Sequence, residues 1–296
     1  MIIQSKKVWL AGQFYPAQLE IEDEKIVAVL DYGTKAVDKD YENNRIVPGF
    51  IDIHCHGAYG FDTNDADPVG LRKWLSKIPE EGVTGLLCTT ITQSKEVLTN
   101  AVKNVARVKE EGNQGASILG IHFEGPYLDM VYKGAQPEQY ILKPNVEEFK
   151  EYQKAANGLI KLITLASEHD DNFELTKYCS KNNVAVSLGH SGATYEEAIM
   201  AVANGAKSMT HIYNGMSPFN HRKNGLVGAA LKFKEVYGEI ICDLNHSTPA
   251  AVNVLYKSKS MDKTLMISDG LMCKGFKAGE KFLFGGNEIE IYPDGS

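Results

Sequence analysis

The sequence of 296 residues predicts an α/β fold in which a (β/α)8 barrel follows a small β domain. Three observations favour this fold. Apolar, β-rich runs recur eight times after Pro48, segments with helical spacing separate most of them, and short alternating segments precede them. Parallel strands covered by helices on both faces read as continuous apolar runs. Eight strand–helix units over about 220 residues have the size of a closed barrel.

The small β domain is expected over residues 1–47. MIIQSKKVWL and AQLEIEDEKIVAVL have strand-like spacing, and AGQ and EDEK interrupt them as turns. The change of pattern at Pro48 places the barrel over residues 48–274 and leaves 275–296 as a final segment.

The barrel prediction depends on strands that alternate with helices. Thr194 with Glu197 predicts a capping box, and Thr248 before Pro249 predicts a second helix start. A doubly wound open sheet is the alternative, but no GxGxxG turn follows the first strand. The eight strands are expected within 50–57, 84–92, 117–125, 160–168, 184–191, 208–214, 239–246 and 264–270.

Composition and charge exclude several classes of function. The net charge of −7 argues against a general surface for nucleic acid or anionic membranes, so an anionic substrate would need a local cluster of donors. The five cysteines are widely spaced and form no CxxC, which favours a reducing compartment. Neither a signal peptide nor an apolar run of ~20 residues is present. We therefore expect a soluble, cytoplasmic protein.

Polar side chains close most of the predicted strands. Because a barrel builds its active site at the carboxyl ends of its strands, these side chains are expected to share one mouth. The residues concerned are His54, His56, Glu124, His190, His211, His246 and Asp269.

His54 and His56 form an HxH pair on the first barrel strand. The two-residue period of a strand points both imidazoles to one side and Cys55 to the other, where it would join the core. Two neutral imidazoles that converge suit zinc or iron. Taken alone, the pair is equally well explained as two hydrogen-bonded polar residues.

Glu124, His190 and His211 extend this candidate metal site. A carboxylate that ends an apolar strand needs a partner, because a buried unpaired charge is costly. Glu124 would bridge two metal ions or pair with a lysine or arginine. A single histidine at a strand end is more often structural, but four histidines and a carboxylate in barrel order favour a metal site.

Asp269, in ISDG at the end of the eighth strand, is the candidate general base. It would bind one metal ion and take a proton from water whose pKa the metal lowers. The alternative is a turn residue, since Asp-Gly favours turns.

Five motifs, PGFIDIHCHG, HFEGP, LGHS, THIYNGM and ISDG, together resemble the amidohydrolase superfamily and, within it, the N-acetylglucosamine-6-phosphate deacetylases. THIYNGM followed by HR, and HFEGPYL followed by KGAQ, are the most specific parts of a likeness that covers nearly the whole chain. Dihydroorotase-like relatives carry a carboxylated lysine at the end of the fourth strand. Here that strand ends LASEHD, and Glu124 is available as the bridge instead.

The resemblance implies a set of ligands and a substrate site. Glu124, His190 and His211 would bind one divalent ion, and His54 and His56 a second, so one or two zinc or iron ions are expected. Arg222 would bind phosphate, for which a guanidinium fork is well suited, although a solvated loop charge is the alternative. The full substrate set would be Ala135, Gln136, Asn214, Gly215, Arg222 and His246. Some relatives carry a histidine at the position of Gln136.

The implied reaction is the hydrolysis of N-acetyl-D-glucosamine 6-phosphate to D-glucosamine 6-phosphate and acetate, in amino-sugar catabolism and by a homodimer. The alternatives are another amidohydrolase, such as a purine deaminase, and a metal-binding barrel without turnover. Family members continue beyond EIEIYPDGS through a substrate loop and closing helices. Residues 275–296 are therefore expected to begin a return to the small domain, which the two ends of the chain would form as a β-sandwich.

Overall fold

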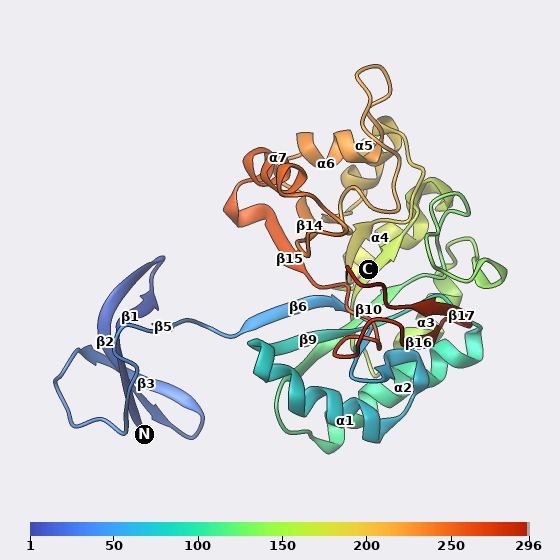
Figure 1. The fold of residues 1–296 in the computed structure, drawn as a ribbon. Helices are drawn as coiled ribbons and strands as arrows, with labels where there is room; N and C mark the ends of the chain where they lie inside the picture. Colours follow the sequence, from blue (N-terminus) through green and yellow to red (C-terminus); the bar gives the residue numbers. More distant parts are fainter. Residues whose placement is uncertain (295–296) are drawn as a thin grey trace. The chain divides into compact units, whose positions relative to one another are not determined.

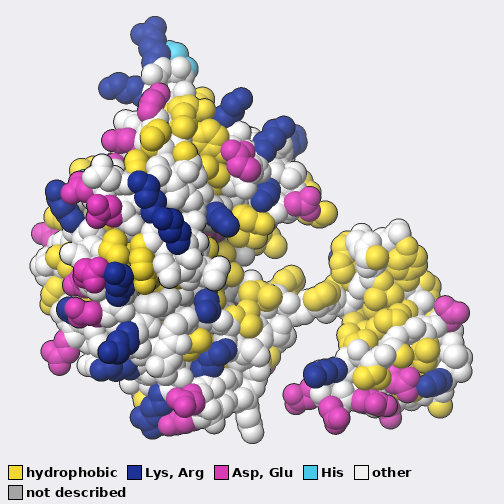
Figure 2. All heavy atoms as spheres, turned by 180° about the vertical axis from the view of Figure 1, so that it is seen from behind, with side chains coloured by type: hydrophobic (Ala, Val, Ile, Leu, Met, Phe, Trp, Pro, Cys, Tyr) yellow, Lys and Arg dark blue, Asp and Glu magenta, His cyan; other side chains and the backbone are white. Residues whose placement is uncertain are grey.

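The computed structural model describes residues 1–294 and divides into two compact units, Met1–Phe50 and the residues from Ile51 onward. Figure 1 shows the first unit as a small sheet and the second as a set of strands surrounded by helices. Charges of both signs are interspersed over the face drawn in Figure 2, without a large patch of one sign. No helix among the described residues has the length and apolar character that a membrane span requires.

The first unit is a five-stranded sheet, and its longest strands lie where residues 1–47 have strand-like spacing. Its strands are β1 (Ile2–Leu10), β2 (Gln13–Glu22), β3 (Lys25–Asp31), β4 (Lys39–Asp40) and β5 (Arg45–Ile46). β1, β2 and β3 pair antiparallel, and β4 and β5 both pair parallel to β1. Val8, Ala17 and Leu19 form its small buried cluster.

The second unit contains all eight predicted barrel strands. They are β6 (Phe50–Cys55), β9 (Val83–Thr90), β10 (Ser117–Glu124), β11 (Ile160–Leu165), β12 (Ala185–Leu188), β13 (Ser208–Met209), β14 (Tyr237–Ile241) and β15 (Thr264–Ile267). The strands are parallel and follow one another in sequence order from β6 to β15, which confirms the barrel prediction.

The barrel closes between its first and last strands at their carboxyl ends. An isolated parallel bridge joins Cys55 to Gly270, the Asp269 amide donates to the His54 carbonyl at 2.9 Å, and the His56 amide donates to the Gly270 carbonyl at 2.8 Å. The closure therefore places Asp269 beside the HxH pair, although more than 200 residues separate them.

Seven α-helices of the described chain connect the barrel strands and lie outside them (Figure 1). They are α1 (Pro68–Lys77), α2 (Lys95–Glu111), α3 (Val146–Ala155), α4 (Glu174–Lys181), α5 (Tyr195–Ala203), α6 (Gly225–Lys232) and α7 (Pro249–Lys259). Both predicted helix starts are confirmed: Thr194 and Glu197 form the capping box of α5, and Thr248 caps α7 with Pro249 in its first turn.

Large side chains fill the space between the strands and the surrounding helices. Trp74, Phe123, Phe149 and Tyr152 are almost completely buried. The Phe123 ring of β10 lies 4.9 Å from Tyr152 and 6.1 Å from Phe149, both on α3. Burial of each such ring stabilises a fold by about 1.5–3 kcal/mol, so the helices hold the strands in fixed positions.

The last described segment is a hairpin of β16 (Lys281–Phe284) and β17 (Asn287–Glu290), which pair with one another. Phe284 packs with Ile91 and Met272, and its ring lies 5.4 Å from the His56 ring. The expected return of 275–296 to the small domain stays a prediction, and its last two residues lie outside the described part of the chain.

The capping box of α5 makes a prediction about stability. Thr194→Ala removes the side chain that accepts from the Glu197 amide and leaves that amide without its cap, so we expect a loss of about 1 kcal/mol in the free energy of unfolding. Urea denaturation measures the change. Thr99→Ala inside α2 is the control, because the Thr99 hydroxyl only bonds the Lys95 carbonyl of its own helix. Equal losses in both variants would contradict the prediction.

Candidate metal centre

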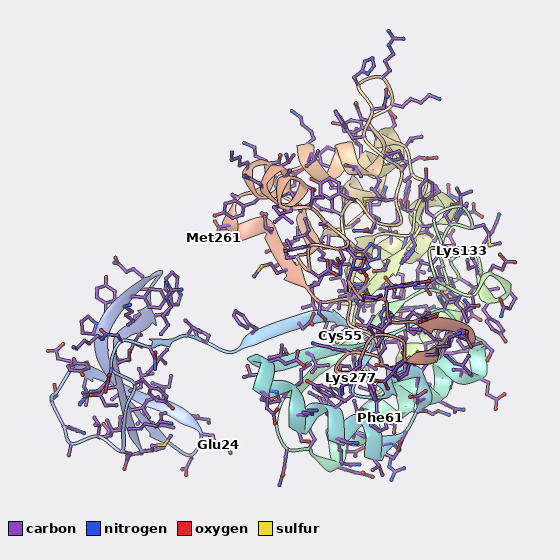
Figure 3. All side chains as sticks on the ribbon, viewed as in Figure 1. Glu24, Cys55, Phe61, Lys133, Met261 and Lys277 are labelled. Atoms are coloured by element: carbon purple, nitrogen blue, oxygen red, sulfur yellow. The ribbon has the colours of Figure 1, made fainter. Side chains whose placement is uncertain are left out.

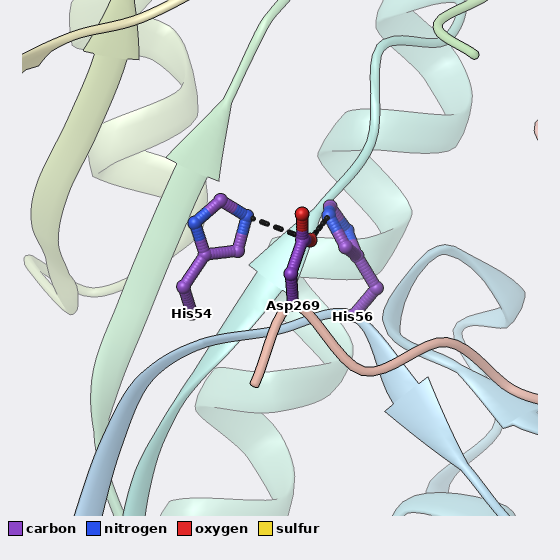
Figure 4. Close-up of side chains that lie close together, drawn as sticks. All are labelled: His54, His56 and Asp269. Atoms are coloured by element: carbon purple, nitrogen blue, oxygen red, sulfur yellow. Dashed lines mark ion pairs between the residues drawn. The ribbon is translucent and has the colours of Figure 1, made fainter. Parts of the chain in front are cut away.

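The HxH pair and Asp269 meet at one point, as Figure 4 shows. His54 lies in β6, and His56 is the first residue after that strand. Both imidazoles turn to the same side. The Asp269 Oδ1 atom lies 3.2 Å from His54 Nε2 and 3.3 Å from His56 Nε2. Together the three residues offer two nitrogens and one oxygen within reach of a single ion.

A second group of three candidate ligands comes from β10 and from the ends of β12 and β13. Glu124 ends β10, and His190 and His211 closely follow β12 and β13. The Nε2 atom of His190 lies 3.4 Å from Glu124 Oε1, and that of His211 lies 3.3 Å from the same oxygen. The two Nε2 atoms lie 3.1 Å from one another. These three residues are also able to hold one ion.

Glu124 links the two groups. Its Oε1 lies 3.3 Å from His54 Nε2, and its Oε2 lies 3.2 Å from His56 Nε2. Each oxygen thus faces a histidine of the HxH pair while Oε1 also faces the second group. A carboxylate in this position can bridge two ions or bind one ion from either side.

Backbone strain helps to aim the ligands. His190, His211 and Asp269 have φ angles of +46°, +27° and +52°, in the left-handed region that side chains other than glycine rarely adopt. Such residues cost of order 1–3 kcal/mol each and persist where the surrounding structure imposes them. All three side chains lie at the cluster around Glu124 and the HxH pair.

Hydrogen bonds set which imidazole nitrogen faces the centre. His190 Nδ1 lies 2.9 Å from the Tyr132 carbonyl, and His211 Nδ1 lies 3.1 Å from the Asn214 carbonyl. Because a carbonyl only accepts, each Nδ1 carries the proton and each Nε2 is left as the ligand atom.

The residues present fit a divalent transition ion. His54 Nε2 and Glu124 Oε1 are buried and have no hydrogen-bond partner in the described structure. Unsatisfied buried polar atoms cost about 1–3 kcal/mol, and an ion would satisfy both. Imidazole nitrogens combined with carboxylate oxygens are typical ligands of zinc and iron.

Electrostatic coupling in the metal-free protein leads to the same conclusion. Burial opposes ionisation of Glu124, but His54 and His190 hold its pKa well below the usual range. Burial likewise opposes protonation of His56, but Asp269 and Glu124 raise the pKa of His56 to about 9. The carboxylates raise the pKa of both His54 and His56, so protons on these two imidazoles compensate the carboxylate charge, and a cation can replace them.

Two further predicted residues lie beside the cluster. Gln136 is buried, donates from Nε2 to Glu124 Oε2 at 2.8 Å and accepts from the Thr92 amide at 2.8 Å. Gly215 has a φ of +55°, and a Cβ there would lie 3.0 Å from His190 Nδ1, so this position suits glycine. The neighbouring Ala135 is exposed, and Asn214 keeps a buried Nδ2 without a partner.

Arg222 and His246 are not brought into contact with the cluster. His246 is exposed and pairs with Asp243 at 2.7 Å. Arg222 is exposed, and its guanidinium makes no hydrogen bond or ion pair within the described chain. It lines a surface cavity of about 730 Å³ together with Tyr132 and Thr194.

Cys55 is fully buried inside the barrel unit, as predicted (Figure 3).

Sequence reasoning missed two buried polar residues close to His54. His122 and Glu239 are fully buried, and the His122 ring lies 4.4 Å from the His54 ring. His122 stands two residues before Glu124 on β10 and therefore faces the same side, which is a signal that alternation could have supplied.

Comparison with known proteins gives the family context. The amidohydrolase family matches residues 45–276, well over half of the chain. N-acetylglucosamine-6-phosphate deacetylase of Bacillus subtilis (strain 168) is 41% identical over 249 residues, which are 83% of this chain and 63% of that protein. This chain therefore spans less than two thirds of the length of that relative.

Two other similar proteins are a deacetylase named for a different sugar and a deacetylase of known structure. N-acetylgalactosamine-6-phosphate deacetylase of Escherichia coli O157:H7 is 31% identical, with 93% of this chain and 72% of that protein covered. Among solved structures, a variant of N-acetyl-D-glucosamine-6-phosphate deacetylase from Mycobacterium smegmatis, in complex with N-acetyl-D-glucosamine-6-phosphate, matches with a TM-score of 0.94. It is 26% identical, and the match covers 99% of this chain and 76% of that one.

The coupled charges predict that metal binding releases protons. With the pKa of His56 near 9, zinc added to the metal-free protein at pH 7.5 must displace its proton. Zinc affinity at this site should therefore rise about tenfold per pH unit for each displaced proton, up to about pH 9. Calorimetry in two buffers of different ionisation enthalpy counts the protons. His56→Asn should release fewer, and identical heats in both buffers for the unmodified protein would disprove the coupling.

Proposed function

The chain belongs to the amidohydrolase family, as its motifs indicate, and from this premise we propose that it deacetylates N-acetyl-D-glucosamine 6-phosphate. The observation that carries the proposal is the cluster of four histidines and two carboxylates at the carboxyl ends of the barrel strands. The relatives that share most of this chain are deacetylases of phosphorylated N-acetyl hexosamines. Water would add across the amide bond, giving acetate and D-glucosamine 6-phosphate.

The proposed cofactor is one or two zinc or iron ions. Glu124, His190 and His211 would hold one ion, and the HxH pair with Asp269 a second. A bound ion supplies Lewis acidity, which polarises the acetyl carbonyl and acidifies water. The protein residues orient the amide, exclude bulk water and move protons.

Asp269 is the proposed proton carrier because it is the accessible carboxylate of the cluster. Its side chain is 21% exposed, whereas that of Glu124 is 2% exposed. Burial opposes ionisation, but His54 and His56 hold the pKa of Asp269 far below its usual range, so the side chain is an ionised carboxylate at neutral pH. It would take a proton from the attacking water and pass it to the leaving amine.

The substrate residues have separate proposed roles. Arg222 and the backbone at Asn214 and Gly215 would bind the 6-phosphate, and Ala135 and His246 would contact the sugar. Arg222 is suited to this role because its guanidinium has no partner within the described chain. Gln136 already donates to Glu124, so it would orient that carboxylate and leave the acetyl oxygen to the ion.

We extend the proposal to a homodimer in the cytoplasm, in amino-sugar catabolism. The five cysteines are all free, which is consistent with a reducing compartment. The homodimer follows from the family resemblance.

A second candidate substrate is N-acetyl-D-galactosamine 6-phosphate. The relative from Escherichia coli O157:H7 carries the name of that deacetylase and is covered over a larger share of its length than the Bacillus subtilis relative. The two sugars differ only in the configuration at C4, and none of the roles proposed above is assigned to the C4 hydroxyl. Both substrates therefore need to be compared directly.

An acetate-release assay tests the proposal. The protein is stripped with a chelator, reloaded with zinc or iron, and supplied with either phosphorylated sugar or with unphosphorylated N-acetylglucosamine. We expect acetate from a phosphorylated sugar, dependent on the added ion. Ammonia from a purine would favour a deaminase instead, and ion binding without turnover of any of these compounds would favour an inert barrel.

Asp269→Asn should separate catalysis from metal binding. Asn keeps the shape of the side chain but cannot accept a proton near neutral pH, so kcat should fall at least about a hundredfold while the fold remains. The ions stay largely bound, since the histidines and Glu124 supply most of the ligands. Measuring kcat, metal content and Tm on one preparation distinguishes this from a turn role. A variant that keeps a third or more of the kcat would rule out the general base.

Arg222→Ala should raise the KM for the phosphorylated sugar and have little effect on unphosphorylated N-acetylglucosamine. The reason is that a guanidinium binds phosphate through paired hydrogen bonds that the unphosphorylated sugar cannot form. Lys223→Ala, on the adjacent exposed residue, is the matched control and should change neither KM strongly. Equal losses on both sugars would show that Arg222 supports the loop and does not bind phosphate.

A further inference from the structure

A buried carboxyl group that the proposed reaction does not use lies inside the barrel beside His54. Glu239 is on β14, on a strand that does not supply a ligand to the cluster, and its side chain is completely buried. Burial of a carboxylate in a barrel interior is costly unless each oxygen finds a partner. The contacts of its two oxygens therefore indicate what the residue does.

One oxygen of Glu239 has a structural role. Its Oε1 accepts hydrogen bonds from the hydroxyls of Ser187 on β12 and Ser208 on β13. These bonds join three consecutive barrel strands from the inside. They fix the plane of the carboxylate, and they leave Oε2 to point away from both serines.

The other oxygen faces His54. Glu239 Oε2 lies 3.9 Å from His54 Nδ1, and both atoms are buried without a hydrogen-bond partner in the described structure. Among the described residues, His54 is also the only ion-pair partner of Glu239. Two complementary atoms that lack any hydrogen-bond partner thus face each other at 3.9 Å.

The position of this contact matters because the opposite nitrogen of His54 faces the metal centre. Nε2 lies 3.3 Å from Glu124 Oε1 and 3.2 Å from Asp269 Oδ1. An imidazole that keeps a proton on Nδ1 offers a lone pair on Nε2, and a carboxylate that accepts from Nδ1 increases the basicity of the ring. His190 and His211 have backbone carbonyls for this purpose, whereas His54 has none.

We propose that Glu239 is a positioning residue, which accepts the Nδ1 proton of His54 and thereby presents Nε2 to the ion of the HxH site. The packing of His122 supports this, because its ring lies edge-on to His54 at 4.4 Å and limits rotation of the imidazole. The proposal rests on the metal centre of the proposed function, but it concerns metal affinity and not the identity of the substrate.

Glu239→Gln is the decisive variant. The amide keeps the size of the side chain and an oxygen acceptor for Ser187 and Ser208, but it turns an N–H toward His54 Nδ1. Nδ1 would then accept, and the proton would move to Nε2, where it blocks the metal. Turning the amide around would cost the two hydrogen bonds from the serines.

The experiment titrates the metal-free full chain with zinc and resolves the two binding steps by calorimetry and elemental analysis. Glu239→Gln should weaken the step assigned to His54, His56 and Asp269 about 10–100-fold and leave the step at Glu124, His190 and His211 unchanged. Ser208→Ala is the matched control, since it removes a bond to Oε1 and leaves Oε2 beside His54. It should lower Tm modestly and keep both zinc affinities.

The outcomes separate this proposal from the proposed function. The inference would be overturned if Glu239→Gln and Ser208→Ala both lowered Tm but bound zinc as tightly as the unmodified protein. Glu239 would then have a structural role only. Absence of zinc binding by the unmodified protein would refute the metal centre itself. Acetate release does not enter this test, so a different substrate would leave its result intact.

A measurement on the unmodified protein keeps the inference testable if Glu239→Gln does not fold. In the zinc-loaded protein with ¹⁵N-labelled histidine, the Nδ1 proton of His54 should resonate far downfield and exchange slowly with water, because a buried carboxylate accepts it. The His54→Asn variant identifies the signal by its loss. A His54 Nδ1 proton that exchanges rapidly would overturn the proposal.

Discussion

The burial of one carboxylate, Glu124, is the constraint on which the rest of the site depends. A buried carboxylate is stable only among groups that compensate its charge, and four imidazoles approach it within 3.4 Å. Those imidazoles come from β6 and from the ends of β12 and β13, so no single segment can supply them. The closed barrel is what brings these strands around one carboxylate. Its core, which packs helices such as α3 against β10, offsets the cost of concentrating polar groups in the interior.

The same constraint accounts for the unusual backbone at the site. His190, His211 and Asp269 all have positive φ angles, and all three follow the last residue of a barrel strand. The chain leaves the extended conformation at each of these residues, and contacts such as the hydrogen bond from the Asp269 amide to the His54 carbonyl hold the backbone there in place. Strain is thus concentrated where ligand direction matters.

Under the proposed function, holding an ion and moving protons would fall to different carboxylates. Glu124 is enclosed by histidines and Gln136, which suits it to hold an ion, whereas the side chain of Asp269 is partly exposed, which suits it to exchange protons. Glu239, beneath His54, is enclosed by serines and acts through an imidazole. Three carboxylates with one chemistry acquire three roles from differences in exposure and partners. Arg222 and His246 lie in exposed segments outside this enclosed set, and their contact with substrate stays a prediction.

Strand order, helix starts and the candidate ligands at the strand ends could all be predicted from sequence patterns. Each candidate ligand follows from a local rule, which is two-residue alternation or the position of a strand's carboxyl end; these residues are His54, His56, Glu124, His190, His211 and Asp269. Which groups meet inside the barrel could not be predicted in this way. The Gln136 contact with Glu124 and the approach of Glu239 to His54 join segments 12 and 185 residues apart. Such contacts depend on the stagger and closure of the strands, which the spacing of residues along one strand does not encode.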